Sequence, residues 1–181
     1  FRILVLAAAG LMLVSWFMPW WAASILELGE AAVVIRPWGL EADLREMNPM
    51  IAGSDMPVWF APLMWTYLGI CIGLLLLSLL VKGKAFSLGK FRFSLPKVLI
   101  GGVGLSYIVV VVLAVIIAAI RTGDFYNVKL IGYSFVSLGE SYESGIESGL
   151  QFGYWLASGV GSLLIVLALF RNKIVGKRLL K

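Results

Sequence analysis

Residues 98–120 read VLIGGVGLSYIVVVVLAVIIAAI and contain no Asp, Glu, Lys or Arg. A helix rises about 1.5 Å per residue, so a stretch of this length can cross the roughly 30 Å hydrocarbon core of a bilayer. Residues 3–24, 56–81 and 148–170 are similarly apolar, and a glycine-rich lead-in extends the last helix to about 145–170. The sequence therefore predicts four transmembrane helices.

The composition agrees with a membrane protein. Of the 181 residues, 61% are hydrophobic and 14% are charged, whereas soluble domains have roughly 45–50% apolar and about 25% charged residues. Four crossings with modest loops use the whole chain, so we expect a single membrane domain over residues 1–181. The predicted fold is an all-α membrane protein, a four-transmembrane-helix bundle with a small β-containing outer cap formed by loops 1 and 3.

The signs of the charges predict an orientation. The connection 82–97 and the tail 171–181 are basic and contain no acid, whereas the connections 25–55 and 121–144, with Glu147 just beyond, contain every acidic residue. By the positive-inside rule, both termini are cytoplasmic and the acidic loops lie outside a cell membrane. The net charge of +5 then predicts contact with anionic membrane lipids, not with nucleic acid.

Tryptophans mark the predicted outer side. Aromatic belts form at membrane interfaces, and all seven tryptophans lie toward the same side, with Trp38 in the first outer loop. Such a rim either anchors the protein in lipid or receives a partner, and we favour anchoring. The six that form the predicted outer interfacial belt are Trp16, Trp20, Trp21, Trp59, Trp65 and Trp155.

Small residues recur at intervals of four, a spacing that lets helix backbones approach closely within a membrane. This predicts helix-packing surfaces, used either inside the bundle or against another subunit, and we favour internal packing. The row that leads into the fourth span is Gly145, Gly149, Gly153, Ala157 and Gly161, and the second span contains the pair Gly69 and Gly73.

The outer loops contain strand signals. Residues 31–36 are a β-branched run before a Pro-Trp-Gly turn, and residues 127–138 favour a strand or hairpin around Gly132, so the two could pair as a cap. Residues 40–47 predict a short amphipathic surface helix. Glu140, Glu143 and Glu147 share a helical spacing, which we interpret as a solvated helix start and not a cation site.

The segment Trp38-Gly39-Leu40 lies in the first predicted outer loop. With four spans, inside termini and strand-like outer segments, it resembles the claudin and related tetraspan membrane proteins, whose first loop carries a Trp, Gly-Leu-Trp and Cys-Cys pattern. Both cysteines of that pattern are missing here. The resemblance covers topology and three residues, so it implies an architecture and transfers no junction-forming function.

The spans contain no ionisable residue of the kind that marks transport or proton relay. The chain has no histidine and one cysteine, Cys71, and we identify no catalytic, cofactor-binding or metal-binding residue. We expect a non-catalytic subunit that packs against other membrane protein subunits, or self-associates, and stabilises a larger complex. The alternative is a small transporter, channel or lipid- or quinone-contacting subunit for a neutral or apolar solute. An enzyme using outer-loop carboxylates such as Asp124 is the weakest hypothesis.

Overall fold

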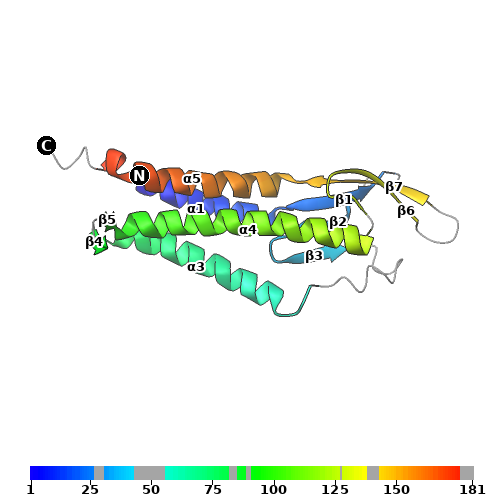
Figure 1. Cartoon of the computed structure of the whole chain (residues 1–181), viewed down its shortest axis with the longest axis horizontal. Helices are drawn as coiled ribbons and strands as arrows, with labels where there is room; N and C mark the ends of the chain where they lie inside the picture. The colour runs from blue at the N-terminus through cyan, green and yellow to red at the C-terminus, as the bar shows by residue number, and fades with distance from the viewer. Residues whose placement is uncertain are drawn as a thin grey trace.

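The computed structural model describes residues 1–26, 31–42, 56–81, 85–88, 91–126, 128–137 and 143–175. These residues form a helical bundle with a sheet at one end, and the start of the first helix and the end of the last helix lie at the other end (Figure 1). The four helices in the described part are α1 (Arg2–Phe17), α3 (Phe60–Leu80), α4 (Leu95–Tyr126) and α5 (Phe152–Val175).

Three of these helices, α3, α4 and α5, are long and apolar enough to cross a membrane, and α1 is a shorter apolar helix. This is consistent with a multi-pass membrane protein. The 32 residues of α4 extend over about 48 Å, more than the roughly 30 Å of a hydrocarbon core. The 16 residues of α1 extend over only about 24 Å.

The first predicted span, residues 3–24, is wrong at its outer end. Helix α1 ends at Phe17, and Met18 is extended, with φ −81° and ψ 151°. Pro19 explains this end, because proline lacks a backbone N–H and disfavours the helical conformation of the residue before it. The chain continues as strand β1 (Trp21–Ile25) instead of a further turn of helix.

The fourth predicted span, residues 145–170, is wrong at its start. Residues Glu143–Leu150 form strand β7, and helix α5 begins only at Phe152. Glycine and serine are poor helix formers, and antiparallel strands on both sides, β1 and β6, supply backbone hydrogen-bond partners for β7. Gly145 and Gly149 therefore belong to a strand, and Glu143 and Glu147 do not share a helical face.

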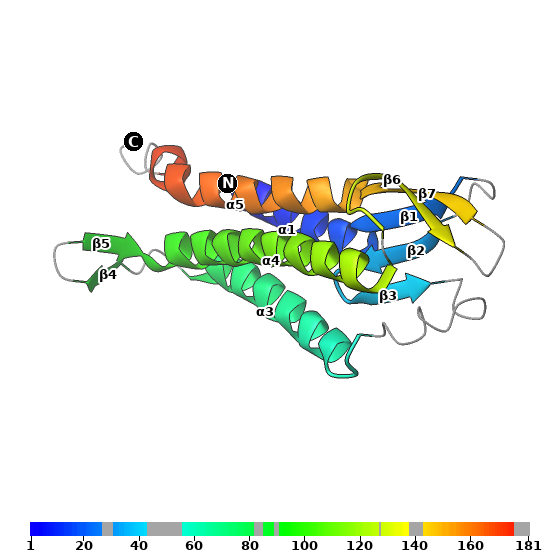
Figure 2. The same ribbon diagram turned by 45° about the vertical axis from the view of Figure 1, so that its right-hand side comes forward.

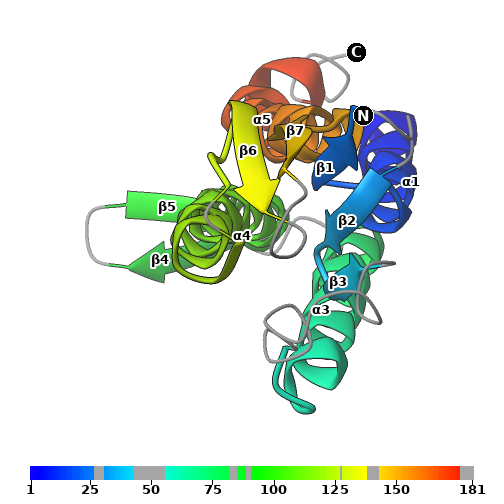
Figure 3. The same cartoon turned by 90° about the vertical axis from the view of Figure 1, so that its right-hand side faces the viewer.

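The sheet at the end of the bundle, where a small β-containing cap was predicted, is a five-stranded antiparallel sheet in the order β3-β2-β1-β7-β6 (Figure 3). Strand β2 (Ala31–Arg36) has the predicted bounds, and β6 (Gly132–Ser137) lies inside the predicted segment 127–138. The two outer segments meet through β1 and β7, which had been assigned to spans. Strand β3 (Gly39–Ala42) replaces the start of the predicted surface helix 40–47, and the rest of that helix lies outside the described residues.

The connection at the opposite end contains a hairpin that the sequence analysis did not predict. Strands β4 (Ala85–Leu88) and β5 (Phe91–Ser94) pair antiparallel, and α4 begins directly after β5 (Figure 2). Residues 176–181 of the predicted tail lie outside the described residues, and α5 continues past the predicted end at residue 170.

Two apolar cores hold the structure. One fills the bundle and includes Met12, Leu75, Tyr107 and Leu164 from the four helices. The other lies under the sheet and includes Trp21, Val33, Val128 and Ile146. Helix α5 makes its most extensive contacts with α4 and then with α1, whereas α3 contacts mainly α4.

Candidate functional site

An apolar pocket lies between the sheet and the halves of the helices that are nearest to it. It forms where α3 inclines away from α4 toward the sheet end of the bundle (Figure 2). Its volume is 160 Å³. The lining residues are Trp20, Trp21, Ile35, Arg36, Pro37 and Leu40 from the sheet side, Met56, Phe60 and Met64 from α3 and the segment before it, Val110, Leu113, Ala114, Val115, Ile117, Ala118 and Arg121 from α4, and Leu150 and Tyr154 beside and within α5.

The tryptophans of the lining present apolar ring surface to the pocket. The Nε1 of Trp20 donates a hydrogen bond to the Ser15 carbonyl at 2.8 Å, and the Nε1 of Trp21 donates to the Leu130 carbonyl at 2.7 Å. These indole N–H groups already have hydrogen-bond acceptors within the protein. The rings therefore contribute apolar surface to the pocket, which suits contact with hydrocarbon. A ligand held here gains affinity mainly from apolar burial.

The pocket has the size and access that a hydrocarbon chain needs. A dry cavity of about 150 Å³ is large enough for an apolar molecule such as benzene. Along α4 the lining extends from Val110 to Arg121, which is about 16 Å of helix. Leu113 and Ile117 line the pocket and yet are 49% and 42% exposed, so the pocket opens sideways on the bundle.

Two arginines supply the charge of the lining. Arg36, at the end of β2, forms an ion pair with Glu41 on β3, and its guanidinium lies 5.6 Å from the centre of the Trp38 ring. Arg121 lies on α4, directly after the uncharged stretch 98–120. Among the described residues that line the pocket, none is Asp or Glu.

Buried hydroxyl groups join the helices beside the pocket. The Ser15 and Tyr107 hydroxyls lie 2.8 Å apart and connect α1 to α4, and both residues are fully buried. The Tyr67 and Ser106 hydroxyls lie 3.1 Å apart and connect α3 to α4. Hydrogen bonds between transmembrane helices stabilise their association, so these contacts fix α1 and α3 against α4.

The predicted small-residue row is divided between two elements. Gly153 and Gly161 lie in helix α5 at close contacts: a Cβ on Gly153 would lie 2.5 Å from the Pro19 carbonyl oxygen, and one on Gly161 would lie 2.7 Å from Ile108 Cδ1. Ala157 between them is fully buried. This part of the row therefore packs inside the chain, against α4 and against the connection between α1 and β1.

The other small residues of the predicted surfaces have different surroundings. On β7, a Cβ on Gly145 would meet the side chain of Leu26, whereas one on Gly149 would meet nothing within 4 Å in the described structure. On α3, a Cβ on Gly69 or Gly73 would also meet nothing described within 4 Å. The α3 pair therefore faces away from the rest of the described bundle.

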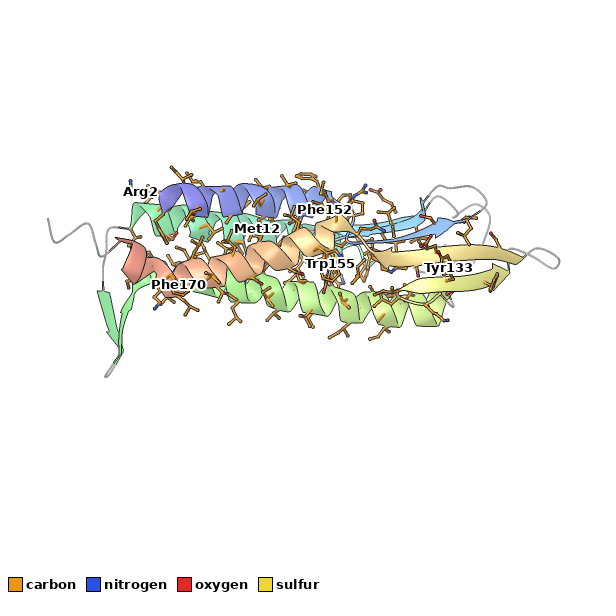
Figure 4. The ribbon with its side chains drawn as sticks, turned by 90° about the horizontal axis from the view of Figure 1, so that it is seen from above. Arg2, Met12, Tyr133, Phe152, Trp155 and Phe170 are labelled. Atoms are coloured by element: carbon orange, nitrogen blue, oxygen red, sulfur yellow. The ribbon has the colours of Figure 1, made fainter. Side chains whose placement is uncertain are left out.

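The six predicted belt tryptophans separate into two groups. Trp16, Trp20 and Trp21 are buried, and Trp16 is 0% exposed. Trp16 and Trp20 belong to the core of the bundle, and Trp21, after the turn at Pro19, belongs to the core under the sheet. The exposed group at the outer end of the bundle, of which Figure 4 shows Trp155 on α5, is Trp59, Trp65 and Trp155.

The sequence alone does not indicate the pocket. Its lining comes from seven separate elements and the segments beside them, and apart from the methionines and aromatics near α3 no local pattern indicates it. Among the described residues, no group of three His, Cys, Asp or Glu side chains could hold a metal ion. The side chains of Asp124, Glu140 and Glu143 lie outside the described part of the structure.

No protein-family model matches the sequence, and no curated protein matches it either. The resemblance to claudins therefore rests on architecture and on Trp38-Gly39-Leu40 alone. In the structure, the Trp38 ring lies beside that of Trp65 on α3, with 6.3 Å between centroids, and Gly39 begins β3. The segment thus joins the sheet to the outer end of α3.

Proposed function

We propose that the chain is a non-catalytic membrane protein that crosses the cell membrane four times and holds the hydrocarbon chain of a lipid or quinone beneath its outer sheet. The observation that carries this proposal is the apolar pocket, which opens sideways beside Leu113 and Ile117. A membrane molecule can enter such a pocket from the bilayer without leaving its apolar surroundings. Binding of this kind needs no reactive side chain.

The placement of α1 supports the fourth crossing. Arg2 at the start of α1 and Phe170 near the end of α5 lie at one end of the bundle, and Phe152 at the start of α5 lies at the other (Figure 4). Helix α1 therefore runs antiparallel to α5 and contacts it extensively. A helix packed in this way passes through the same layer as its neighbour, and its shorter length is compatible with local thinning of the bilayer.

Cysteine labelling in intact cells tests the orientation. In a Cys71→Ala background, we expect a membrane-impermeant maleimide to label Tyr133→Cys on β6 and to leave Arg2→Cys and Lys97→Cys unlabelled until the cells are opened. The proposed topology places β6 outside and both other positions inside. Labelling of Arg2→Cys in intact cells would contradict the crossing by α1.

A pair of substitutions on α4 tests chain binding. Ala114 lines the pocket, whereas Ala119 on the same helix is exposed and does not line it. We expect Ala114→Phe to fill the pocket and to lower the amount of lipid or quinone that copurifies in mild detergent. Losing contact with two methylenes, at ~0.8 kcal/mol each, lowers the affinity about tenfold. Equal retention by Ala114→Phe and Ala119→Phe, measured by mass spectrometry of the extract, would contradict the proposal.

A second candidate function is attachment to a larger membrane complex. The observation that favours it is the outward position of Gly69 and Gly73 on α3, because small residues on an exposed face allow close approach of another helix. We expect mass measurement after mild-detergent purification to detect a partner or a second copy, and Gly69→Leu to remove it. If the protein purified at its native abundance is a monomer without any partner, this second function is contradicted.

A further inference from the structure

The hairpin between α3 and α4 is a second surface that suits a membrane, separate from the pocket. We infer that β4 and β5 lie along the surface of the inner leaflet, with their apolar face in the bilayer and the basic residues of this segment at anionic lipid headgroups. The inference rests on the proposed crossings by α3 and α4, and it does not depend on chain binding in the pocket.

The first step concerns the two faces of the hairpin. In an antiparallel pair, residues directly opposite each other share a face, and so do alternate residues along each strand. The apolar face consists of Phe86 opposite Phe93 and Leu88 opposite Phe91, and the other face consists of Ala85 opposite Ser94 and Ser87 opposite Arg92. In the described structure, β4 and β5 form a sheet of their own. A two-stranded hairpin is only marginally stable in water, so a further surface against the apolar face would stabilise it.

The second step concerns charge. All ten Asp and Glu residues of the chain lie between residues 27 and 55 or between residues 124 and 147. Of these, Glu41 and Glu147 are in the sheet at the opposite end of the bundle. The segment 82–97 contains no acidic residue, and its basic residues are Lys82, Lys84, Lys90, Arg92 and Lys97. Anionic lipid headgroups are therefore the complement that this segment favours.

The third step concerns position. Helix α4 begins at Leu95, directly after β5, and its uncharged stretch begins at residue 98. The end of β5 is thus about 6 Å along the helix axis from the hydrocarbon core. Amphipathic helices at membrane surfaces bury their apolar face by a similar depth, about 5–10 Å.

The direction of the hairpin matches this position. The strands project sideways from the start of α4, across the direction of the helices (Figure 3, Figure 4). The Nη1 of Arg171 on α5 donates a hydrogen bond to the Ser94 hydroxyl at 2.9 Å, which attaches the base of the hairpin to the bundle. If α4 crosses the bilayer, the hairpin therefore extends along the membrane surface and not away from it.

Quenching by lipid tests the inference in the full chain. In a Cys71→Ala background, Phe86→Cys, Ser87→Cys or Leu88→Cys carries a fluorescent label, and the protein is reconstituted in vesicles of phosphatidylcholine and phosphatidylglycerol. We expect phosphatidylcholine brominated at the start of its chains to quench the labels at residues 86 and 88. The label at residue 87 should be nearly unquenched. It is the matched control, because residue 87 lies between the other two on the same strand and on the opposite face.

A charge substitution tests the headgroup part. With the label at residue 86, Lys90→Gln should lower the ratio of lipid-bound to free hairpin about fivefold, as expected for one basic residue near an anionic surface. In vesicles of phosphatidylcholine alone, the same substitution should change this ratio little. Lys129→Gln is the control, because Lys129 is an exposed cation between α4 and β6, at the other end of α4.

The outcomes separate this inference from the proposed function. Equal quenching at residues 86, 87 and 88, or quenching at none of them, would overturn the inference. Self-quenching of the labels that rises with protein density, without quenching by lipid, would show that a second copy covers the apolar face and would also overturn it. An equal effect of Lys90→Gln in both kinds of vesicle would overturn the headgroup part. Retention of lipid by Ala114→Phe and maleimide labelling of Lys97→Cys report separately on the pocket and on the orientation. Thermal unfolding of each variant checks that it is folded.

Discussion

Gly104 on α4 and Gly161 on α5 face each other at a close contact between the backbones of the two helices. A Cβ on Gly104 would lie 3.0 Å from the Gly161 carbonyl oxygen, and one on Gly161 would lie 3.4 Å from the Gly104 carbonyl oxygen. The two backbones approach this closely because neither residue has a side chain, which is how transmembrane helices gain dispersion contacts without a hydrophobic force between them.

This contact predicts that the two glycines differ in their tolerance of alanine. At Gly104 the added methyl would meet Leu164 Cβ at 2.9 Å and backbone atoms at 3.0 Å, which cannot move independently of α5. At Gly161 it would meet mainly the flexible end of Ile108. We expect Gly104→Ala to lower the free energy of unfolding by ~1–3 kcal/mol and Gly161→Ala to lower it less, as measured by thermal unfolding in detergent.

Gly102 and Gly159 provide matched controls on the same two helices. A Cβ at either position would meet nothing within 4 Å in the described structure. Because alanine is a better helix former than glycine by ~1 kcal/mol, both alanine variants should be neutral or slightly stabilising. Equal destabilisation at Gly102 and Gly104 would show that close backbone approach is not the cause.

The Ser15–Tyr107 hydrogen bond predicts a coupled pair. Both hydroxyls are buried, at 2.8 Å from each other, and Ser15 Oγ also lies 2.8 Å from the Met12 carbonyl oxygen, to which it can donate. We expect Tyr107→Phe to cost ~0.6–1.7 kcal/mol, the range for hydrogen bonds between transmembrane helices. In a double-mutant cycle with Ser15→Ala, the combined loss should be smaller than the sum. Strict additivity would indicate that the two hydroxyls do not interact.

The two groups of tryptophans predict different spectroscopic behaviour. Trp155 is 62% exposed, whereas Trp16 is fully buried beside Trp20, with ring centroids 6.4 Å apart. Brominated lipids quench tryptophans that they contact, so Trp155→Phe should reduce the quenched fraction of the fluorescence. Trp16→Phe should leave that fraction nearly unchanged and should lower thermal stability instead. The reverse pattern would place Trp16 at the lipid surface.

Ser148 on strand β7 has a structural role, which the predicted helix over this segment did not indicate. Ser148 is buried, and its hydroxyl donates to the Lys129 carbonyl at 2.6 Å, which ties the segment between α4 and β6 to the sheet. We expect Ser148→Ala to cost ~0.5–1.5 kcal/mol because it removes this partly buried hydrogen bond. Ser162→Ala is the control, since Ser162 is exposed and bonds only to the Ser158 carbonyl of its own helix. A similar effect in both variants would contradict this role.

The sequence correctly predicted the elements whose secondary structure is set by residues within the element itself. Residues 98–120 lie wholly within α4, and residues 56–81 contain α3, because the length of an uncharged apolar run is the property that a bilayer selects. The β-branched run 31–36 is β2 with the predicted bounds. Its β-branched side chains favour a strand, and the proline and glycine that follow favour a turn, so both signals lie within a few residues of β2.

The predictions were wrong for two segments whose backbone can form either a helix or a strand of the sheet. Residues 21–25 belong to the same uncharged run as most of the helix before them, and they form a strand because β2 and β7 flank them. Residues 143–150 have a helical spacing of small residues, but the backbone pairs with β1 and β6. Apolar composition does not distinguish helix from strand, so the choice depends on which backbone partners the fold brings close.

The sequence by itself therefore determined that the chain is apolar enough for several crossings, where the longest helices lie, and which residues could form strands. The tertiary structure decided which tryptophans are buried, which glycines touch another backbone, and that a pocket exists at all. The pocket depends on the angle between α3 and α4, the glycine contact depends on the packing of α4 against α5, and the surroundings of Trp20 and Trp21 depend on the turn at Pro19. Periodicity records only neighbours along one helix or strand, so it contains no information about that angle.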